Sequence, residues 1–260
     1  MAFRGVDFAR LARFNSATSC ELLEFYDEFV DNKILADLSE PPSKFIAPSG
    51  IRCQRMQWFR LRGTEPDRAS TVDRVLNFTA EVGIALHRMI QRNLREALKD
   101  DWVRVEDYLK ENPIDHTYTL KEVDDGLETQ IEFHDLPIRF ACDGIIRWKG
   151  QYYLLEIKSS EFSSFDELTD PKSQHIAQTK CYSSMLRLRG VIYIYIDRQY
   201  GGLKFYEKQF SEADMQEVEN TIKYIAEMAE ANIAPDRLPT GDSWCTPSRC
   251  KFYKVCKQWG

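Results

Sequence analysis

The sequence predicts an α/β domain with a mixed central sheet, because two kinds of hydrophobic periodicity follow each other along the chain. Apolar residues recur every three or four positions near both ends, which is typical of amphipathic helices. The middle of the chain changes to the two-residue period of strands. This order of helix, strands, helix, strands and helix is typical of helices packed on a sheet. The length of 260 residues favours one large domain over two small ones.

Helices are expected over residues 19–35, 52–62, 73–98, 171–188 and 211–231. Pro171 suits the first turn of the fourth helix, and Gly190 suits its end. Ser211 is expected to cap the last helix, with Asp214 at the capping-box position. The segment 39–49 contains three prolines and is therefore expected to be a loop.

Strands are expected over residues 117–123, 129–133, 138–148, 151–158, 191–197 and 203–210. The third and fourth strands are separated by Lys149 and Gly150, a pair suited to a tight hairpin turn. Gly201 and Gly202 separate the last two strands. The sequence therefore predicts two hairpins.

The charged residues are unevenly placed. Nine arginines stand against four acidic residues between positions 51 and 95, and twelve acidic residues against three basic ones between 100 and 136. The last 17 residues hold four basic residues and no acidic one. This pattern suggests one surface that attracts phosphate groups, with solvated helix faces as the alternative. The net charge of −6 excludes a globally basic nucleic-acid coat.

Hydropathy and cysteine content bear on the compartment. The longest apolar run, over residues 191–196, is far too short to span a bilayer, so an integral membrane protein is not expected. The first 19 residues lack the apolar core of a secretory signal. We therefore expect a reducing, cytoplasmic compartment, in which the seven cysteines are metal ligands or buried thiols rather than disulfides.

The most informative residues are Asp143, Glu156 and Lys158. Alternate residues of a strand share a face, so Glu156 and Lys158 point the same way, and the hairpin turn can bring Asp143 close to both. Burying these charges in an apolar sheet is costly without a partner, and a hard divalent cation such as Mg²⁺ or Mn²⁺ would neutralise the carboxylates. The alternative is a cross-strand salt bridge without chemistry. The flanking apolar residues favour burial and hence the metal site.

Asp143 followed, across a hairpin, by Glu156, Ile157 and Lys158 resembles the motif of the PD-(D/E)XK nucleases. The Asp-Gly pair before apolar residues resembles the RecB-like branch in particular. Cys142 stands where the motif has proline, at a position that varies widely in such enzymes. The resemblance implies a restriction-endonuclease-like core, with a central mixed sheet flanked by helices, and metal-dependent hydrolysis of DNA.

Two helix motifs resemble further elements of the same branch. Gly83 and His87 are four residues apart on one helix face, and they resemble the GxxxH helix whose histidine is a metal ligand. Without the resemblance, a lone helix histidine is more often an ordinary surface or core residue. Gln178 and Tyr182, also four residues apart, resemble the QxxxY element. His175 is expected near the start of that helix and is given no metal role.

The resemblance implies a role for each of these residues. The Mg²⁺ or Mn²⁺ ligands would be His87, Asp143, Glu156 and the backbone carbonyl of Ile157. Lys158 would position the attacking water. Gln178 and Tyr182 would support Lys158 or the scissile phosphate.

Three cysteines are clustered in a basic, aromatic tail with the spacing C-x4-C-x5-C: Cys245, Cys250 and Cys256. Together with Cys53 they resemble the iron–sulfur RecB-like nucleases, which include the AddB nuclease domain and the CRISPR-associated exonucleases. The resemblance implies a [4Fe–4S] cluster that joins the two ends of the core. The family usually has two residues in the first gap, so zinc with four thiolates stays an alternative, as do unrelated buried thiols. The remaining cysteines are expected to be buried thiols: Cys20, Cys142 and Cys181.

The prediction is thus a single nuclease domain over residues 1–260. It comprises a helical, cysteine-bearing segment (1–65), a nuclease core (66–232) and a cysteine-rich tail (233–260) that packs on the first segment. We expect a DNA exonuclease acting on ends or single strands, with partners in recombination and repair, phage replication or CRISPR adaptation. The alternative is a non-catalytic iron–sulfur or zinc subunit that binds DNA or supports assembly. The intact set of charged residues argues against that alternative.

Overall fold

The computed structural model describes residues 21–38, 43–67, 73–239, 241–247 and 249–259. They fall into two compact units: α2 (Glu21–Leu38) with the start of α4 (Arg74–Leu98) through Phe78, and the remaining described residues. The expected helix start at Ser19, the expected buried thiol of Cys20 and the prolines at 41 and 42 lie outside the described residues. The division into one domain with inner boundaries at 65 and 232 stays a prediction.

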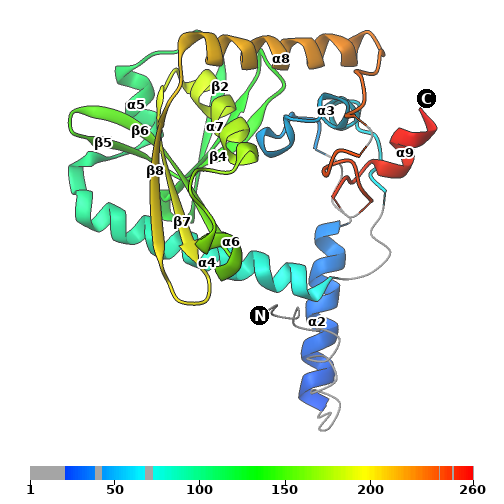
Figure 1. Cartoon of the computed structure of the whole chain (residues 1–260), viewed down its shortest axis with the longest axis horizontal. Helices are drawn as coiled ribbons and strands as arrows, with labels where there is room; N and C mark the ends of the chain where they lie inside the picture. Colours follow the sequence, from blue (N-terminus) through cyan, green and yellow to red (C-terminus); the bar gives the residue numbers. More distant parts are fainter. Residues whose placement is uncertain (1–20, 39–42, 68–72, 240, 248, 260) are drawn as a thin grey trace. The chain divides into compact units, whose positions relative to one another are not determined.

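Figure 1 shows how the larger unit is built from helices and strands. Its further helices are α3 (Gln54–Leu61), α5 (Val105–Glu111), α6 (Phe162–Asp166), α7 (Ser173–Leu186), α8 (Glu212–Glu230) and α9 (Tyr253–Gln258), with short 3-10 turns at Pro48–Gly50, Lys99–Asp101 and Asp124–Gly126. Its strands are β1 (Trp102–Val103), β2 (Tyr118–Val123), β3 (Glu128–Phe133), β4 (Arg139–Cys142), β5 (Ile145–Trp148), β6 (Gln151–Ser160), β7 (Gly190–Asp197) and β8 (Leu203–Gln209). No helix among the described residues is both long enough and apolar enough to cross a membrane.

The strands form two sheets. The larger has the order β1-β5-β6-β7-β8, with β6 and β7 parallel and every other pair antiparallel. The smaller is the antiparallel sheet β2-β3-β4. The prediction of an α/β fold with a mixed sheet is therefore confirmed. Lys149 and Gly150 have φ angles of 51° and 77°, which the tight turn between β5 and β6 requires.

The prediction of one continuous strand over residues 138–148 is wrong. The chain leaves the smaller sheet after β4 and enters the larger sheet at β5, with Asp143 and Gly144 between them. Gly144 has a φ angle of 150°, and a Cβ there would lie 2.7 Å from the Trp102 side chain. Glycine alone fits this corner. Asp143 consequently lies in the corner between two strands and not within the single strand that the sequence predicted.

The structure also corrects the ends of the fourth expected helix. Pro171 precedes α7, which begins at Ser173. Arg187 ends the helix in the left-handed conformation, so Gly190 instead begins β7. The predicted capping box of α8 is confirmed, because the Ser211 side chain accepts the Asp214 N–H and the Asp214 side chain accepts the Ser211 N–H. The short elements β1, α5, α6 and α9 were not predicted, because none is long enough to show a period.

The larger sheet is covered on both faces. On one face, Leu86 and Ile90 of α4 pack in a cluster with Leu155 and Ile157 of β6. On the other face lies α7, whose Thr179 hydroxyl is hydrogen-bonded to Tyr193 of β7. Figure 1 shows α4 and α7 on these opposite sides of the sheet. A sheet buried on both faces explains why β6 and β7 are almost continuously apolar.

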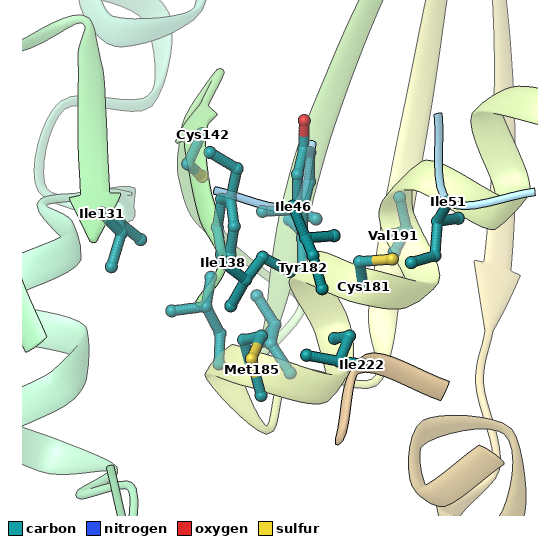
Figure 2. Packing of buried hydrophobic residues seen from close by; sticks show 14 of the residues in the cluster. Ile46, Ile51, Ile131, Ile138, Cys142, Cys181, Tyr182, Met185, Val191 and Ile222 are labelled. Atoms are coloured by element: carbon teal, nitrogen blue, oxygen red, sulfur yellow. The ribbon is translucent and has the colours of Figure 1, made fainter. Parts of the chain in front are cut away.

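The main core lies between α7, α8 and the sheets. Figure 2 shows Tyr182, Cys181 and Met185 of α7 packed among isoleucines from several elements. Cys142 and Cys181 are both fully buried, so the prediction that they are buried thiols is confirmed. Ile46 joins this core from the segment before α3 and forms a parallel bridge with Ile138.

The segment around α3 packs against the C-terminal tail. Phe59 is stacked on Phe252, with ring centroids 5.4 Å apart. The indole N–H of Trp58 donates to the carbonyl of Met228 at the end of α8, at 3.0 Å. The backbone N–H of Asp67 donates to the carbonyl of Lys251 at 2.6 Å. Two segments that are distant in the sequence are thus held side by side.

Candidate active site

Asp143 is held at two points in the corner between β4 and β5. Its Oδ2 accepts a hydrogen bond from the backbone N–H of Ile157 at 2.7 Å. Its carbonyl oxygen accepts a hydrogen bond from the side-chain amide of Gln91, on α4, at 2.9 Å. Both partners are fully buried. The structure therefore brings the carboxylate of Asp143 against the middle of β6.

Glu156 and Lys158 point to the same face of β6 and contact each other. The Nζ atom of Lys158 lies 2.5 Å from Oε1 of Glu156, and Glu156 is only 1% exposed. Burial raises the pKa of the Glu156 carboxyl to about 7, opposed by Lys158 and assisted by Asp143. Burial by itself lowers the pKa of Lys158, but the negative charges of Glu156 and Asp143 outweigh it, so this pKa is raised. One ammonium group thus faces two carboxylates.

His87 reaches the same point from α4. Its Nδ1 lies 4.0 Å from Oδ2 of Asp143. A Cβ on Gly83 would lie 3.2 Å from the hydroxyl of Ser159, so the glycine one turn earlier lets the helix approach β6 closely. Burial lowers the pKa of His87, while Asp143 opposes this shift and Lys158 adds to it. The neutral imidazole is the form that binds metal ions.

Gln178 and Tyr182 lie on α7, on the side of the sheet that Glu156 faces. The amide of Gln178 donates to the hydroxyl of Tyr182 at 2.6 Å. Burial raises the pKa of Tyr182 well above its usual value, and the charge of Glu156 adds to this. Among the described residues no hydrogen bond joins either side chain to Lys158. Their expected support of Lys158 or of a phosphate stays a prediction.

The structure adds residues that the sequence motifs did not indicate. Tyr195 is the neighbour of Lys158 in the register of β6 and β7, and its hydroxyl is bonded to Nδ1 of His175 at 2.7 Å and to the backbone N–H of Lys172 at 3.1 Å. Burial lowers the pKa of His175 to about 3, with the charges of Lys158 and Lys172 adding to this. Helices α6 and α7 connect β6 to β7, so the sequence contains no turn that indicates which residues of these two strands pair. Gln91 could have been found, because it lies one turn after His87.

The kinds of side chain that meet here suit a divalent cation. Two carboxylates and an imidazole form a mixed oxygen and nitrogen donor set that accommodates Mg²⁺ or Mn²⁺. Within the described residues, however, no three His, Cys, Asp or Glu side chains are placed so that they could hold one ion. Glu156 contacts Lys158, and Asp143 contacts the N–H of Ile157. The donors therefore fit a cation in their chemistry, and would exchange these internal contacts for it.

Four thiols line one small pocket between the segment around α3 and the tail: Cys53, Cys245, Cys250 and Cys256. All four are free thiols. Burial raises the pKa of the Cys53 thiol to about 11, and the other three cysteines add to this. Their placement suits a thiolate-bound metal or cluster, because such a group would relieve this repulsion. In this pocket too, no three of the described side chains are placed so that they could hold one metal ion.

Several arginines of the basic stretch have partners within the protein. Arg52 contacts Asp242, and Arg74 contacts Asp27 and Asp31. The side chain of Arg95 donates to a backbone carbonyl, as does that of Arg60. These contacts favour a structural use for much of the stretch. A role of the remaining arginines in holding DNA stays a prediction.

No protein-family model and no curated protein matches the sequence. Among solved structures, the crystal structure of SSO0001 is similar with a TM-score of 0.47 and 19% identity, over 89% of this chain and 96% of that one. An alkaline exonuclease (LHK-Exo) from Laribacter hongkongensis has a TM-score of 0.41 and 13% identity, over 76% of this chain and 93% of that one. Its complex with dAMP has a TM-score of 0.36 and 16% identity, over 54% and 67%. These likenesses are remote, so the chemistry of the site is inferred from its residues.

Proposed function

We propose that this chain is a metal-dependent nuclease that hydrolyses phosphodiester bonds of DNA. The observation that carries the proposal is that four charged or titratable side chains lie around Asp143 and the middle of β6, in contact as pairs: His87 with Asp143, and Glu156 with Lys158. Such a cluster is costly in an apolar sheet unless it serves a purpose. Its members also match, in order along the chain, the motif of the RecB-like PD-(D/E)XK nucleases.

The cation would be Mg²⁺ or Mn²⁺, held by His87, Asp143, Glu156 and the carbonyl of Ile157. When bound, it would supply the positive charge that polarises a phosphate oxygen and lowers the pKa of a water. The Gln91 amide already fixes the backbone of Asp143, so little ordering of the backbone is needed at that ligand. His87 is neutral because of its burial and can offer a nitrogen lone pair.

Lys158 would orient the attacking water and stabilise negative charge on the phosphate. Its raised pKa keeps it protonated at neutral pH, so it acts as a hydrogen-bond donor. With Glu156 serving as a ligand of the cation, the Lys158 ammonium would be available to the phosphate. Gln178 and Tyr182 would support this lysine or the phosphate from α7.

The four cysteines would hold a [4Fe–4S] cluster, with zinc as the alternative. They join the segment around α3 to the tail, outside the sheet that carries the carboxylates. The cluster would therefore stabilise the fold and take no part in hydrolysis. A reducing, cytoplasmic compartment agrees with four free thiols.

One observation favours a second candidate. The ammonium of Lys158 contacts the carboxylate of Glu156 and compensates its charge from within the protein. The second candidate is a subunit that binds DNA or supports assembly, with a cysteine-bound cluster or zinc. Its nuclease site would be vestigial, and the same contact between Lys158 and Glu156 would be found in it. Such a subunit would bind DNA without cutting it.

Digestion of end-labelled DNA separates these candidates. Single-stranded and double-stranded substrates, each with a free, 5′-blocked or 3′-blocked end, are incubated with Mg²⁺, Mn²⁺ or EDTA. An exonuclease releases mononucleotides or short products from one unblocked end, and only with a metal ion. DNA binding without cleavage in the presence of either metal ion would refute the nuclease and support the subunit.

The proposal extends to exonuclease action on DNA ends or single strands. The process would be recombination and repair, phage replication or CRISPR adaptation, with the corresponding protein partners.

A further inference from the structure

Two aromatic side chains are exposed just beyond the carboxyl ends of β6 and β7, and β6 is the strand that carries Glu156 and Lys158. Phe162 of α6 and Tyr200 of the β7–β8 turn are 43% and 70% exposed. Their ring centroids are 5.1 Å apart and their planes meet at 87°. Each ring is in contact with the other, yet both keep a large surface open to solvent. Aromatic surface left in water has a free-energy cost, which a ligand that covers it would remove.

Tyr200 is fixed by a hydrogen-bonded turn. The two carboxylate oxygens of Asp197 accept the backbone N–H groups of Gln199 and Tyr200, at 3.0 and 2.9 Å. Asp197 itself is buried. The turn also packs closely on α6, since a Cβ at Gly202 would lie 3.2 Å from the Phe165 ring. The backbone that carries Tyr200 is therefore ordered before any ligand arrives.

Phe162 is fixed in the same way through α6. The Nζ atom of Lys204, on β8, donates to the carbonyls of Phe165, Asp166 and Leu168 at 2.7 to 2.9 Å. These bonds hold the end of α6 on the edge of the sheet. Figure 1 shows α6 beside the turn between β7 and β8. Two independent sets of hydrogen bonds thus order the backbone segments that carry the two rings, which reduces the ordering cost of binding.

The pair lies where a ligand of the larger sheet is expected. Phe162 follows Lys158 by four residues, and the backbone of Ser160 accepts the N–H of Arg198 just before Tyr200. Both rings therefore stand at the carboxyl ends of the parallel strands β6 and β7, the end of the sheet at which α/β proteins bind ligands.

The neighbouring charges favour a flat, uncharged partner over a phosphate. Arg198 faces Glu161 at 3.4 Å, and Lys204 is occupied by three backbone carbonyls. Both of these cations beside the rings are thus engaged by groups of the protein itself. A nucleobase has a π face that stacks on such rings regardless of its identity.

We propose that Phe162 and Tyr200 form a stacking site for one unpaired base of the DNA strand bound at the active site. This inference rests on the proposed nuclease function for its substrate. It deepens that function, because a base that stacks on a protein ring cannot remain in a duplex. The bound strand is therefore single-stranded or frayed beside the cleaved bond, and the site reads no sequence.

The test measures binding, so that it does not depend on cleavage. The dissociation constant of the full chain is measured by fluorescence anisotropy in EDTA, for a single-stranded oligonucleotide and for the same length made of abasic residues. Stacking predicts that the intact oligonucleotide binds roughly 5- to 100-fold more tightly than the abasic one. The double variant Phe162→Ala, Tyr200→Ala should lose most of this preference, while its affinity for the abasic strand stays the same.

Matched variants keep the test decisive. Trp148→Ala removes another exposed aromatic, 47% exposed, from the opposite end of the β5–β6 hairpin, and should leave the preference unchanged. Phe162→Trp and Tyr200→Phe keep a ring and should retain it. Equal affinity of the unaltered chain for both strands, or an undiminished preference in the double variant, would overturn the stacking site. A preference for bases in a chain that cuts no DNA would refute the nuclease and leave the stacking site standing.

Discussion

The side-chain amide of Gln91 donates to the backbone carbonyl of Asp143 at 2.9 Å, and both residues are buried. This single bond connects α4 to the corner between the two sheets. The same helix carries His87, one turn earlier. The helix therefore supplies a candidate ligand and also fixes the backbone of a second one.

Gln91→Leu should reduce catalysis more than stability. The substitution keeps the volume and removes the bonds to the carbonyls of Asp143 and Leu127. It also removes the Oε1 atom of Gln91, which has no hydrogen-bond partner among the described residues. We expect a change of about 1 kcal/mol or less in the free energy of unfolding, and a fall in kcat of about tenfold or more. Urea unfolding and steady-state digestion measure the two. A large loss of stability with unchanged kcat would make Gln91 a purely structural residue.

Glu156→Gln and Lys158→Met should each abolish most DNA cleavage and leave DNA binding in place. Each variant keeps the approximate shape and removes one charge, and the loss of a positioned electrostatic group costs ~10²–10³ in rate. Lys208→Met is the control, because its partner Asp170 is exposed and lies outside the site. Cleavage rates at saturating substrate are compared. Full activity in either site variant would refute the assignment of the active site.

Metal dependence should be complete. EDTA should stop cleavage and added Mg²⁺ or Mn²⁺ should restore it, because the carboxylates repel a phosphodiester unaided. His87→Ala should raise the Mn²⁺ concentration for half-maximal activity by about tenfold or more. His134→Ala, which removes an exposed imidazole, is the control. An unchanged Mn²⁺ dependence in His87→Ala would remove this residue from the ligand set.

The purified protein should be brown and contain about four irons per chain, as a [4Fe–4S] cluster requires. Cys250→Ala should lose the iron and become aggregated or protease-sensitive, because metal binding contributes folding energy when a site is not preformed. Cys181→Ala provides the control, since it removes a fully buried thiol and should leave the iron content unchanged. A colourless protein with one zinc would keep the ligands and refute the cluster. Unaltered stability and metal content in Cys250→Ala would refute the ligand set itself.

The stability of the fold should fall as the pH falls below about 6.5, in part through His175. Burial lowers the pKa of this imidazole from 6.5 to about 3 in the folded chain. Between these values the unfolded state binds a proton that the folded state does not, so acid favours unfolding by at most about 1.4 kcal/mol per pH unit. His175→Gln should show a shallower decline than the unaltered chain between pH 7 and pH 5 in urea unfolding. Equal slopes for His175→Gln and the unaltered chain would show that His175 titrates normally.

Much of the fold could be predicted from short-range sequence patterns. The features that could not be predicted depend on contacts between residues distant in the sequence. The hairpin at Lys149 and Gly150 and the capping box at Ser211 are short-range signals that a sequence carries fully. The break at Gly144 is different, because its cause is a clash with Trp102, about forty residues away. The strand-forming residues on both sides of Asp143 and Gly144 therefore predicted one strand instead of two.

The candidate site divides in the same way. Glu156 and Lys158 could be placed on one face from strand period alone, and the turn brought Asp143 near them. His175 and Tyr195 could not be placed, because they meet through the parallel pairing of β6 with β7 across a helix. Parallel register is set by tertiary packing and not by any turn between the strands.

The two bonds that hold Asp143 differ in how they can form. The bond to Ile157 closes a separation of 14 residues within one hairpin, whereas the bond to Gln91 closes one of 52 residues and needs α4 docked on the sheet. Short loops close at a lower entropic cost, so the hairpin can form before the helix arrives. Asp143 is then bound to β6 but not yet fixed in its backbone. We expect partly folded chains to hold the carboxylate loosely and to be inactive, so catalytic competence appears only after α4 has docked on the sheet.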